Sequence, residues 1–294
     1  MYRAEEQGSS PEEIRKKVQV EDLSIDVDGL RIRFLRAGSG PALVLVHGLL
    51  GYSFSWRHIV SALARHSSVY ALDMPGAGYS QCSPEMDCCM RACAGRLLRF
   101  MDEVGINDCD LLGTSHGGAV AMMASSIAPE RIRRLILVDP VNPWSAHGRV
   151  LSLLLSNRVV APIFCKFVPG FELLHDFYFR RMYGDTRRIR PGTLEGYMKP
   201  LYRSGALEYG LSILRSWNHD LKLLESIFPR ISHIPTLIVW GSLDRAVAPA
   251  SAAELRAQFE DGELVIMEGV GHLPYEEVPE QFVEVVSGFL ARKT

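Results

Sequence analysis

Short apolar runs alternate with segments of helical spacing through most of this chain, and this alternation constrains the fold more than any other feature. The runs 41–48, 67–73, 110–113 and 132–139 are continuous rather than alternating in polarity, which is typical of strands buried on both faces. Segments with apolar residues three and four positions apart lie between them. We therefore expect an α/β fold whose mostly parallel sheet is covered by helices on both faces.

The alternation stops after residue 140 and resumes at residue 233. Residues 141–232 are rich in aromatic residues and arginine and contain helical segments without a convincing strand. This pattern predicts a helical insertion between the sixth and seventh strands of a core formed by residues 21–140 and 233–294. Residues 1–20 are charged and are expected to form a separate tail.

Composition and charge exclude several classes of partner. The 294 residues carry a formal net charge of −2, so no basic surface for nucleic acid or for an anionic membrane is expected. No apolar run approaches the roughly 18–20 residues of a membrane span. The first twenty residues lack the apolar segment of a secretory signal, so we expect a cytoplasmic protein without a membrane partner.

Four of the six cysteines crowd into residues 82–93, which raises the question of a metal site. The spacing fits zinc or iron–sulfur ligation poorly, because there is no C-x-x-C pair and no second Cys/His pair nearby. Residues 86–105 also have the pattern of an amphipathic helix, with Cys89 and Cys93 near its apolar face. We therefore expect buried free thiols and no bound metal.

Ser115 lies in a G-x-S-x-G sequence, between an apolar run and a segment of small residues. This motif has chemical meaning where a strand turns sharply into a helix. Such a turn presents the serine hydroxyl above the sheet and directs the amide of His116, at a helix N-terminus, toward the same point. Ser115 is therefore the candidate nucleophile, and the His116 amide is a candidate oxyanion donor.

A serine hydroxyl needs a base, and the base needs a carboxylate that fixes its tautomer. Among nine histidines, His272 follows the last expected strand, in a loop at the edge of the sheet where Ser115 lies. Asp244 directly follows the preceding strand at the same edge, and Asp139, which also ends a strand, is the alternative acid. We predict Ser115, Asp244 and His272 as the catalytic residues.

The chain order serine, aspartate, histidine resembles that of the α/β-hydrolase superfamily, and further motifs extend the resemblance over residues 22–292. HGLLG (47–51) is similar to the superfamily's oxyanion loop, and DMPGAGYS (73–80) to its loop after the fourth strand. GHLPYEEVPEQF (271–282) is similar to its C-terminal motif. The resemblance implies that the amide of Leu49 joins that of His116 in an oxyanion hole. It also implies that the insertion 141–232 is a helical cap.

The same resemblance narrows the chemistry. Epoxide hydrolases and haloalkane dehalogenases of this fold have an aspartate where this chain has Ser115. Hydrolases that break carbon–carbon bonds usually have a glycine-rich oxyanion loop and a tryptophan after the histidine, and this chain has HGLLG and Leu273. We therefore expect a cofactor-independent carboxylic ester hydrolase. Carbon–carbon hydrolase, lactonase, thioesterase and perhydrolase activities stay open, as does a non-catalytic ligand receptor.

The insertion is expected to supply the substrate pocket. Phe171, Phe177 and Tyr178 are its candidate substrate-binding residues, because apolar and aromatic residues are dense around them. We expect a small-molecule ester with a short-to-medium acyl chain as the substrate, and a monomer or homodimer as the assembly.

Overall fold

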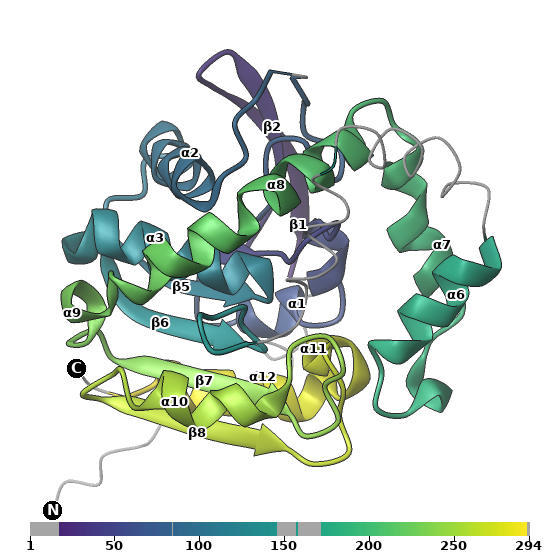
Figure 1. Cartoon of the computed structure of the whole chain (residues 1–294). Helices are drawn as coiled ribbons and strands as arrows, with labels where there is room; N and C mark the ends of the chain where they lie inside the picture. Colours follow the sequence, from purple (N-terminus) through teal and green to yellow (C-terminus); the bar gives the residue numbers. More distant parts are fainter. Residues whose placement is uncertain (1–17, 84, 146–156, 158–171, 293–294) are drawn as a thin grey trace, which may run out of the picture.

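The computed structural model describes residues 18–83, 85–145, 157 and 172–292 (Figure 1). These residues contain an eight-stranded sheet of order β1-β2-β4-β3-β5-β6-β7-β8. Its strands are β1 (Val20–Val27), β2 (Leu30–Ala37), β3 (Ala42–Val46), β4 (Ser68–Leu72), β5 (Cys109–Thr114), β6 (Ile132–Val138), β7 (Thr236–Gly241) and β8 (Gly262–Met267).

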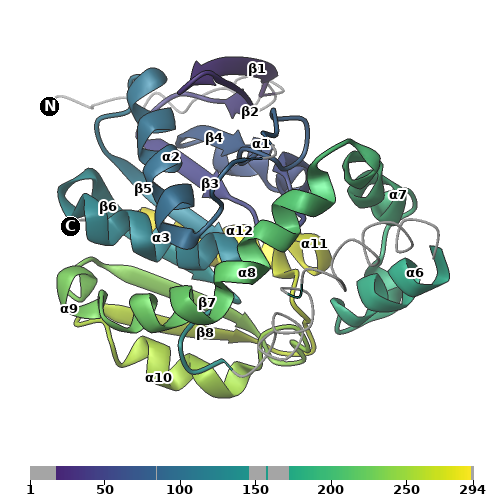
Figure 2. The same ribbon diagram turned by 45° about the horizontal axis from the view of Figure 1, so that its top comes forward.

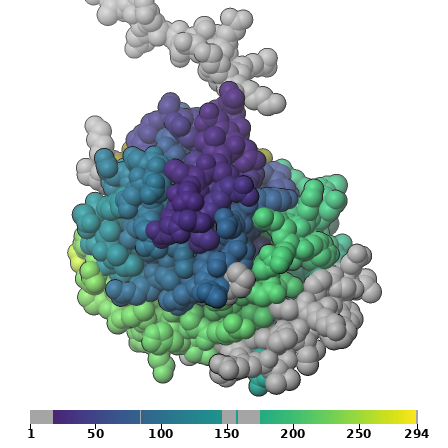
Figure 3. All heavy atoms as spheres, turned by 90° about the horizontal axis from the view of Figure 1, so that it is seen from above, coloured from purple at the N-terminus to yellow at the C-terminus, as the bar shows by residue number. Residues whose placement is uncertain are grey.

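The sheet is parallel from β4 to β8, and β1 and β2 add an antiparallel hairpin at one edge. Val27 pairs with Leu30, so the hairpin turns at Asp28 and Gly29, whose φ angles are both positive, as a tight hairpin turn requires. In the space-filling view this hairpin (purple) lies at the surface of the molecule (Figure 3). The expected mostly parallel sheet is confirmed.

Helices connect the strands and cover both faces of the sheet. Their bounds are α1 (Val60–Leu63), α2 (Met90–Glu103), α3 (His116–Ile127), α6 (Glu172–Arg181), α7 (Thr193–Met198), α8 (Ala206–Glu225), α9 (Phe228–Ile231), α10 (Ala252–Arg256), α11 (Pro274–Glu277) and α12 (Pro279–Leu290). Short 3-10 helices are η2 (Ser53–Trp56), η3 (Pro129–Arg131), η5 (Thr186–Arg188), η6 (Lys199–Tyr202) and η7 (Pro249–Ser251).

Alternate residues of the central strands pack into two separate apolar cores. On β3, Val44 and Val46 join a core with residues of α2, α3, α8, α9 and α10, whereas Leu43 and Leu45 join a core with residues of α1, α11 and α12. Because both faces of these strands are buried, their sequences are apolar without alternation.

The cysteine-rich helix begins later than its apolar pattern suggests. Asp87 Oδ1 accepts a hydrogen bond from the amide of Cys89 (2.9 Å), a local turn that competes with helix, and α2 starts at Met90. Cys88 and Cys93 are buried. Burial raises the pKa of the Cys88 thiol to about 11, so this thiol is protonated near neutral pH and packs as a small apolar group.

The segment between β6 and β7 is helical in its described part. Helices α6 and α7 lie beside the main body of the fold, and α8 runs from them along α3 toward α9 (Figures 1 and 2). Tyr209, Trp217 and Leu221 of α8 belong to the larger of the two cores. The second half of this segment therefore packs on helices that cover the sheet.

Candidate active site

Ser115 occupies a strained turn between β5 and α3. Its φ of 53° is in the left-handed region, which residues with a side chain rarely adopt. Its amide donates to the carbonyl of Val138 on β6 (2.9 Å), which joins the turn to the neighbouring strand. Gly117 permits the close approach of α3 to β3, because a Cβ there would lie 2.3 Å from the His47 carbonyl oxygen. The chain thus holds the Ser115 side chain at the carboxyl edge of the sheet.

The loop after β3 lies directly against Ser115. A Cβ on Gly48 would lie 3.0 Å from the Ser115 Cβ and 3.6 Å from its Oγ. No acceptor for the amide of Leu49, the next residue, occurs among the backbone hydrogen bonds of the described residues. His116 is the first residue of α3, so its amide has no acceptor within the helix. An oxyanion hole requires two such amides beside the nucleophile.

His47 is buried beneath this loop and supports it. Its Nε2 accepts a hydrogen bond from the amide of Met74 (2.9 Å), so its proton is on Nδ1, which donates to the carbonyl of Gly48 (2.8 Å). Burial lowers the pKa of His47, which agrees with this neutral form. His47 therefore holds the loops after β3 and β4 together and has no free nitrogen for catalysis.

His272 and Asp244 form a buried hydrogen-bonded pair. His272 Nδ1 donates to Asp244 Oδ2 over 2.7 Å. The other oxygen, Oδ1, accepts from the amides of Ala246 (2.7 Å) and Val247 (3.0 Å) in the turn after β7. Three N–H donors therefore hold the Asp244 carboxylate, and the carboxylate holds the imidazole with Nε2 free to act as a base.

Asp139 follows β6 and lies next to this pair. Asp139, Asp244 and His272 each offer a side-chain donor atom, and these atoms lie within 4.8 Å of one another. Three such groups can hold a metal ion, but His272 and Asp244 are joined by a direct hydrogen bond at 2.7 Å. The arrangement therefore fits an oriented base better than a metal centre.

The loop that carries His272 is held by residues for which the sequence predicts no role. The His272 amide donates to the Met182 carbonyl (2.7 Å). Glu277 accepts from the amides of Gly271 (2.6 Å), Gly184 (2.9 Å) and Asp185 (3.2 Å). The short segment after α6 is thereby joined to the loop after β8. Glu277 is part of the 271–282 motif, so a signal for it was present in the sequence, although its partners were not.

The topology of the sheet places Ser115 and His272 at the same edge. Ser115 follows β5 and His272 follows β8, and the carboxyl ends of these parallel strands lie at one edge. A Cβ on Gly241, at the end of β7, would overlap the Gly271 carbonyl oxygen, so the β7 and β8 loops are in close contact. Within the described residues no hydrogen bond joins Ser115 to His272. In general, a nucleophile and its base are often not hydrogen-bonded to each other in the absence of substrate.

The His116 ring lies in an apolar environment. It stacks on Trp217 of α8, with ring centroids 5.9 Å apart. Burial lowers the pKa of His116 to about 4, so the ring is neutral at pH 7. Its Nε2 and the Trp217 Nε1 are both buried without a hydrogen-bond partner. The His116 side chain is thus a neutral group beside the candidate nucleophile, separate from the role of its amide.

Two of the three aromatic residues expected to bind substrate lie at the surface. Phe177 and Tyr178 are 55% and 57% exposed and contact each other edge to face. Phe171 lies outside the described residues. Neither Phe177 nor Tyr178 lines the cavity described next.

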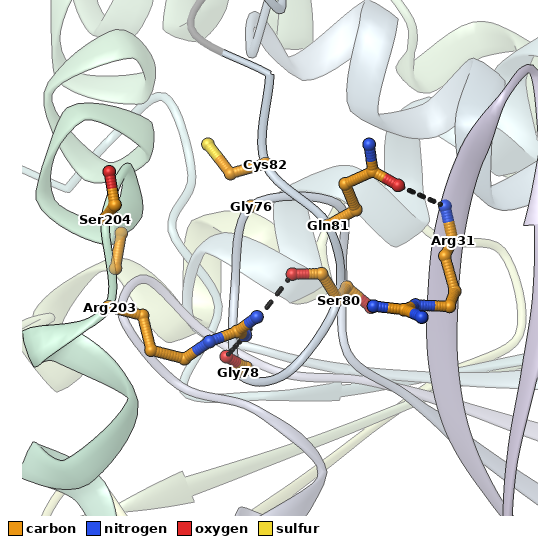
Figure 4. A pocket seen from close by; sticks show the side chains of 9 residues that line it. Arg31, Gly76, Gly78, Ser80, Gln81, Cys82, Arg203 and Ser204 are labelled. Atoms are coloured by element: carbon orange, nitrogen blue, oxygen red, sulfur yellow. Dashed lines mark hydrogen bonds between the residues drawn. The ribbon is translucent and has the colours of Figure 1, made fainter.

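A cavity of about 200 Å³ lies between the loop after β4 and the start of α8 (Figure 4). The Arg203 guanidinium group reaches this loop and donates to the carbonyls of Gly78 (2.5 Å) and Ser80 (3.4 Å). None of the candidate catalytic residues lines the cavity. Its lining residues are Arg31, Gly76, Gly78, Ser80, Gln81, Cys82, Arg203, Ser204 and Ala206.

Within its described part, the chain has no helix that combines the length and the apolar composition needed to cross a membrane.

Comparisons with known proteins identify one family and several similar hydrolases. Residues 43–285 match the model of the alpha/beta hydrolase family. A pimeloyl-[acyl-carrier protein] methyl ester esterase of Aeromonas hydrophila is 30% identical over 260 residues, which cover 87% of this chain and 97% of the esterase. The crystal structure of a bacterial membrane phospholipase A is 27% identical, with a TM-score of 0.76 and coverage of 92% of this chain and 86% of that one. A 2-hydroxy-6-oxo-6-phenylhexa-2,4-dienoate hydrolase of Rhodococcus has the same fold, with a TM-score of 0.79 at 22% identity, covering 94% of this chain and all of that one.

Proposed function

Because this chain belongs to the alpha/beta hydrolase family, we propose that it is a serine hydrolase that cleaves carboxylic esters through an acyl-enzyme. Its relatives include ester hydrolases, which supports hydrolase activity in general. The choice of ester bond and of serine as the nucleophile is supported by the side chains at the carboxyl edge of the sheet.

In the first half-reaction, His272 Nε2 takes the proton of Ser115 as Oγ attacks the ester carbonyl carbon. The carbonyl electron pair moves onto oxygen, and the amides of Leu49 and His116 stabilise that oxyanion. The oxyanion then re-forms the carbonyl as the bond to the alcohol oxygen breaks. His272 gives its proton to the departing oxygen, so the alcohol leaves neutral and Ser115 is acylated.

In the second half-reaction, water replaces the alcohol. His272 takes a proton from water as the water oxygen attacks the acyl carbon, and the same amides stabilise the second oxyanion. The bond to Ser115 then breaks, and Oγ recovers a proton from His272. Asp244 stays charged throughout and stabilises the imidazolium that forms twice in each cycle.

One observation carries the proposal: the 2.7 Å bond between His272 Nδ1 and Asp244 Oδ2, at the edge where Ser115 is strained. A buried imidazole whose Nδ1 proton is held by a carboxylate presents a basic Nε2. Strain of the Ser115 backbone destabilises the fold and is typical of positions where function requires it.

We assign residues 141–232 as a cap over this edge. Its described part is attached to the catalytic loop by buried polar contacts. Tyr197 of α7 donates to Glu276 Oε1 (2.7 Å), and Glu276 also pairs with Arg57. Since Glu276 and Glu277 follow His272 closely, the cap and the base are held together, and the acyl chain would bind between the cap and the sheet.

The name of one relative and the proposed place of the cap support a substrate class. The Aeromonas relative is named for an acyl methyl ester, a substrate with a small alcohol and an extended acyl chain. We propose short-to-medium acyl esters for this chain, with Phe171, Phe177 and Tyr178 as candidate contacts to the acyl group.

A series of p-nitrophenyl esters from C2 to C12 tests the proposed activity. The wild-type protein should release p-nitrophenol, and Ser115→Ala should abolish turnover, because loss of a nucleophilic serine costs on the order of a million-fold in kcat. Ser126→Ala is the matched control, since its hydroxyl bonds within α3 to the Met123 carbonyl. Wild-type protein that binds these esters without turning them over would instead support a ligand receptor.

A further inference from the structure

Asp139 is a buried carboxyl group that the proposed reaction does not use. It follows β6, its φ of 45° is left-handed, and none of its surface is exposed. Its Oδ1 accepts the amide of Gly241 at the end of β7 (2.9 Å). Its Oδ2 is buried and accepts no hydrogen bond from the described residues. A strained, buried residue with one unsatisfied oxygen calls for a physical explanation.

The neighbouring carboxyl group, Asp244, is bound very differently. Its two oxygens accept three N–H groups, from His272, Ala246 and Val247, whereas Asp139 accepts one. N–H donors stabilise the charged form of a carboxyl group, and a second anion nearby opposes it. Because one oxygen of each carboxyl group and one His272 nitrogen lie within 4.8 Å of one another, both carboxyl groups cannot easily be charged.

We propose that Asp139 is a positioning residue for the base: it is a neutral carboxylic acid at pH 7 and shares one negative charge and one proton with Asp244. Asp244, with three donors, holds the charge, and Asp139 holds the proton on Oδ2; one oxygen of each carboxyl group lies within 4.8 Å of the other. This inference rests on the proposed role of His272. It explains why Oδ2 has no donor, because a protonated oxygen is itself a donor.

The electrostatic environment of Asp139 agrees with this assignment. Burial raises the pKa of Asp139 well above its usual range, and the negative charges of Asp244 and Glu277 raise it further. The amide of Gly241 acts in the opposite direction. The remaining titratable groups beside it are Tyr275 and His272, and Glu277 is itself paired with Arg188.

The shared charge would matter for the base. Two full negative charges beside His272 would favour its protonated form, and a protonated imidazole cannot accept the Ser115 proton. A single charge, held on Asp244, orients the ring and stabilises the imidazolium that forms during the reaction. Asp139 therefore acts through Asp244 and touches no reacting atom.

The pH dependence of kcat/KM separates a neutral Asp139 from an ionised one. In Asp139→Asn the amide can replace a carboxylic acid as donor and still accept from Gly241. We therefore expect kcat to fall only a few-fold, and the acid limb of the pH profile of kcat/KM to stay at the same pH as in wild type. If Asp139 were ionised, the same substitution would remove a charge near His272. The acid limb would then move by about 1 to 3 units toward lower pH. Such a shift would overturn the inference.

A double-mutant cycle gives a second readout. When Asp244→Asn removes the charge that opposes ionisation of Asp139, Asp139 can ionise and serve His272. We therefore expect Asp139→Asn to cost at least about tenfold more in the Asp244→Asn protein than in wild type, a coupling typical of groups in one network. Equal costs in the two backgrounds would show that Asp139 is only structural.

Infrared spectroscopy tests protonation independently of turnover. Protein labelled with ¹³C-aspartate should show, at pH 7, a protonated-carboxyl C=O band that Asp139→Asn lacks. Absence of that band in folded wild-type protein would overturn the inference. Absence of ester turnover with the band present would instead count against the proposed function alone.

Discussion

Replacement of Glu277 by glutamine is expected to weaken both the fold and the reaction. The Glu277 side chain is fully buried, with Oε1 bound to the amides of Gly271 and Gly184, and Oε2 bound to Asp185 and, at 3.3 Å, to Arg188. Glutamine keeps one acceptor oxygen. Its NH₂ group would face the Asp185 amide and the Arg188 guanidinium, which now donate to Oε2.

The magnitude follows from the lost contacts. Two hydrogen bonds to a charged group are lost and the Asp185 amide is left without this acceptor, at about 1–3 kcal/mol each, whereas Arg188 keeps its bond to the Gly269 carbonyl (3.0 Å). Partial relaxation brings the expected loss to about 2–4 kcal/mol. For a chain of this size we take about 2 °C per kcal/mol, hence a fall in melting temperature of about 4–8 °C. Because Gly271 precedes His272, a small shift of the ring should also lower kcat about tenfold.

Thermal unfolding followed by circular dichroism, together with kcat on a p-nitrophenyl ester, measures both effects. Glu280→Gln is the matched control, because Glu280 is exposed and lies three residues further along the chain. A melting temperature for Glu277→Gln within 1 °C of the control would refute the argument. So would a lowered melting temperature with an unchanged kcat, which would mean that Glu277 holds the cap but not the base.

Three further predictions concern the acid, the acyl pocket and pH. Asp244→Asn should lower kcat by about 10³ to 10⁴ without unfolding the protein, because asparagine favours the wrong tautomer of the imidazole and Asp139 compensates only in part; a loss smaller than that of Asp139→Asn would move the acid to the end of β6. Each buried methylene contributes roughly 0.8 kcal/mol, about fourfold, so kcat/KM should rise from C2 to medium chains and then level off. Phe177→Ala should shift that optimum more than it changes the rate on acetate, and equal scaling of all substrates would make Phe177 structural. The buried His116 has its pKa lowered to about 4, whereas the unfolded chain binds a proton near 6.5, so folding stability should fall as pH drops from about 6.5 to 4. Chemical denaturation across this range should show a flatter fall for His116→Gln than for the exposed control His66→Gln.

Much of this fold was predictable because the central strands are buried on both faces. A strand such as β3 has few alternatives when every residue must be apolar, and parallel strands place their carboxyl ends at one edge. Ser115 and Asp244 each follow such a strand, and His272 follows the parallel edge strand β8, so their chain positions put all three at the same edge. The α2 boundary was less predictable, because the turn formed by Asp87 competes with the helix pattern.

The contacts that hold the site could not be predicted in the same way. Glu277 bonds to Gly184 and Asp185, which lie more than ninety residues away along the chain. No periodicity or local motif encodes that pairing, because it depends on how the cap packs on the loop after β8. The different environments of Asp139 and Asp244 could not be predicted either. The sequence places both at one edge, but the number of amides that each accepts depends on the turn after β7.

Covalent labelling by a fluorophosphonate probe tests the central claim most directly, because the probe reacts with a serine that a neighbouring base has activated. Intact-mass spectrometry should show one adduct per chain, and peptide mapping should place it on Ser115. The rate of labelling should fall in His272→Ala and stay unchanged in Ser126→Ala. A folded protein that acquires no adduct, or acquires it on another residue, would contradict the assignment of Ser115 as the nucleophile.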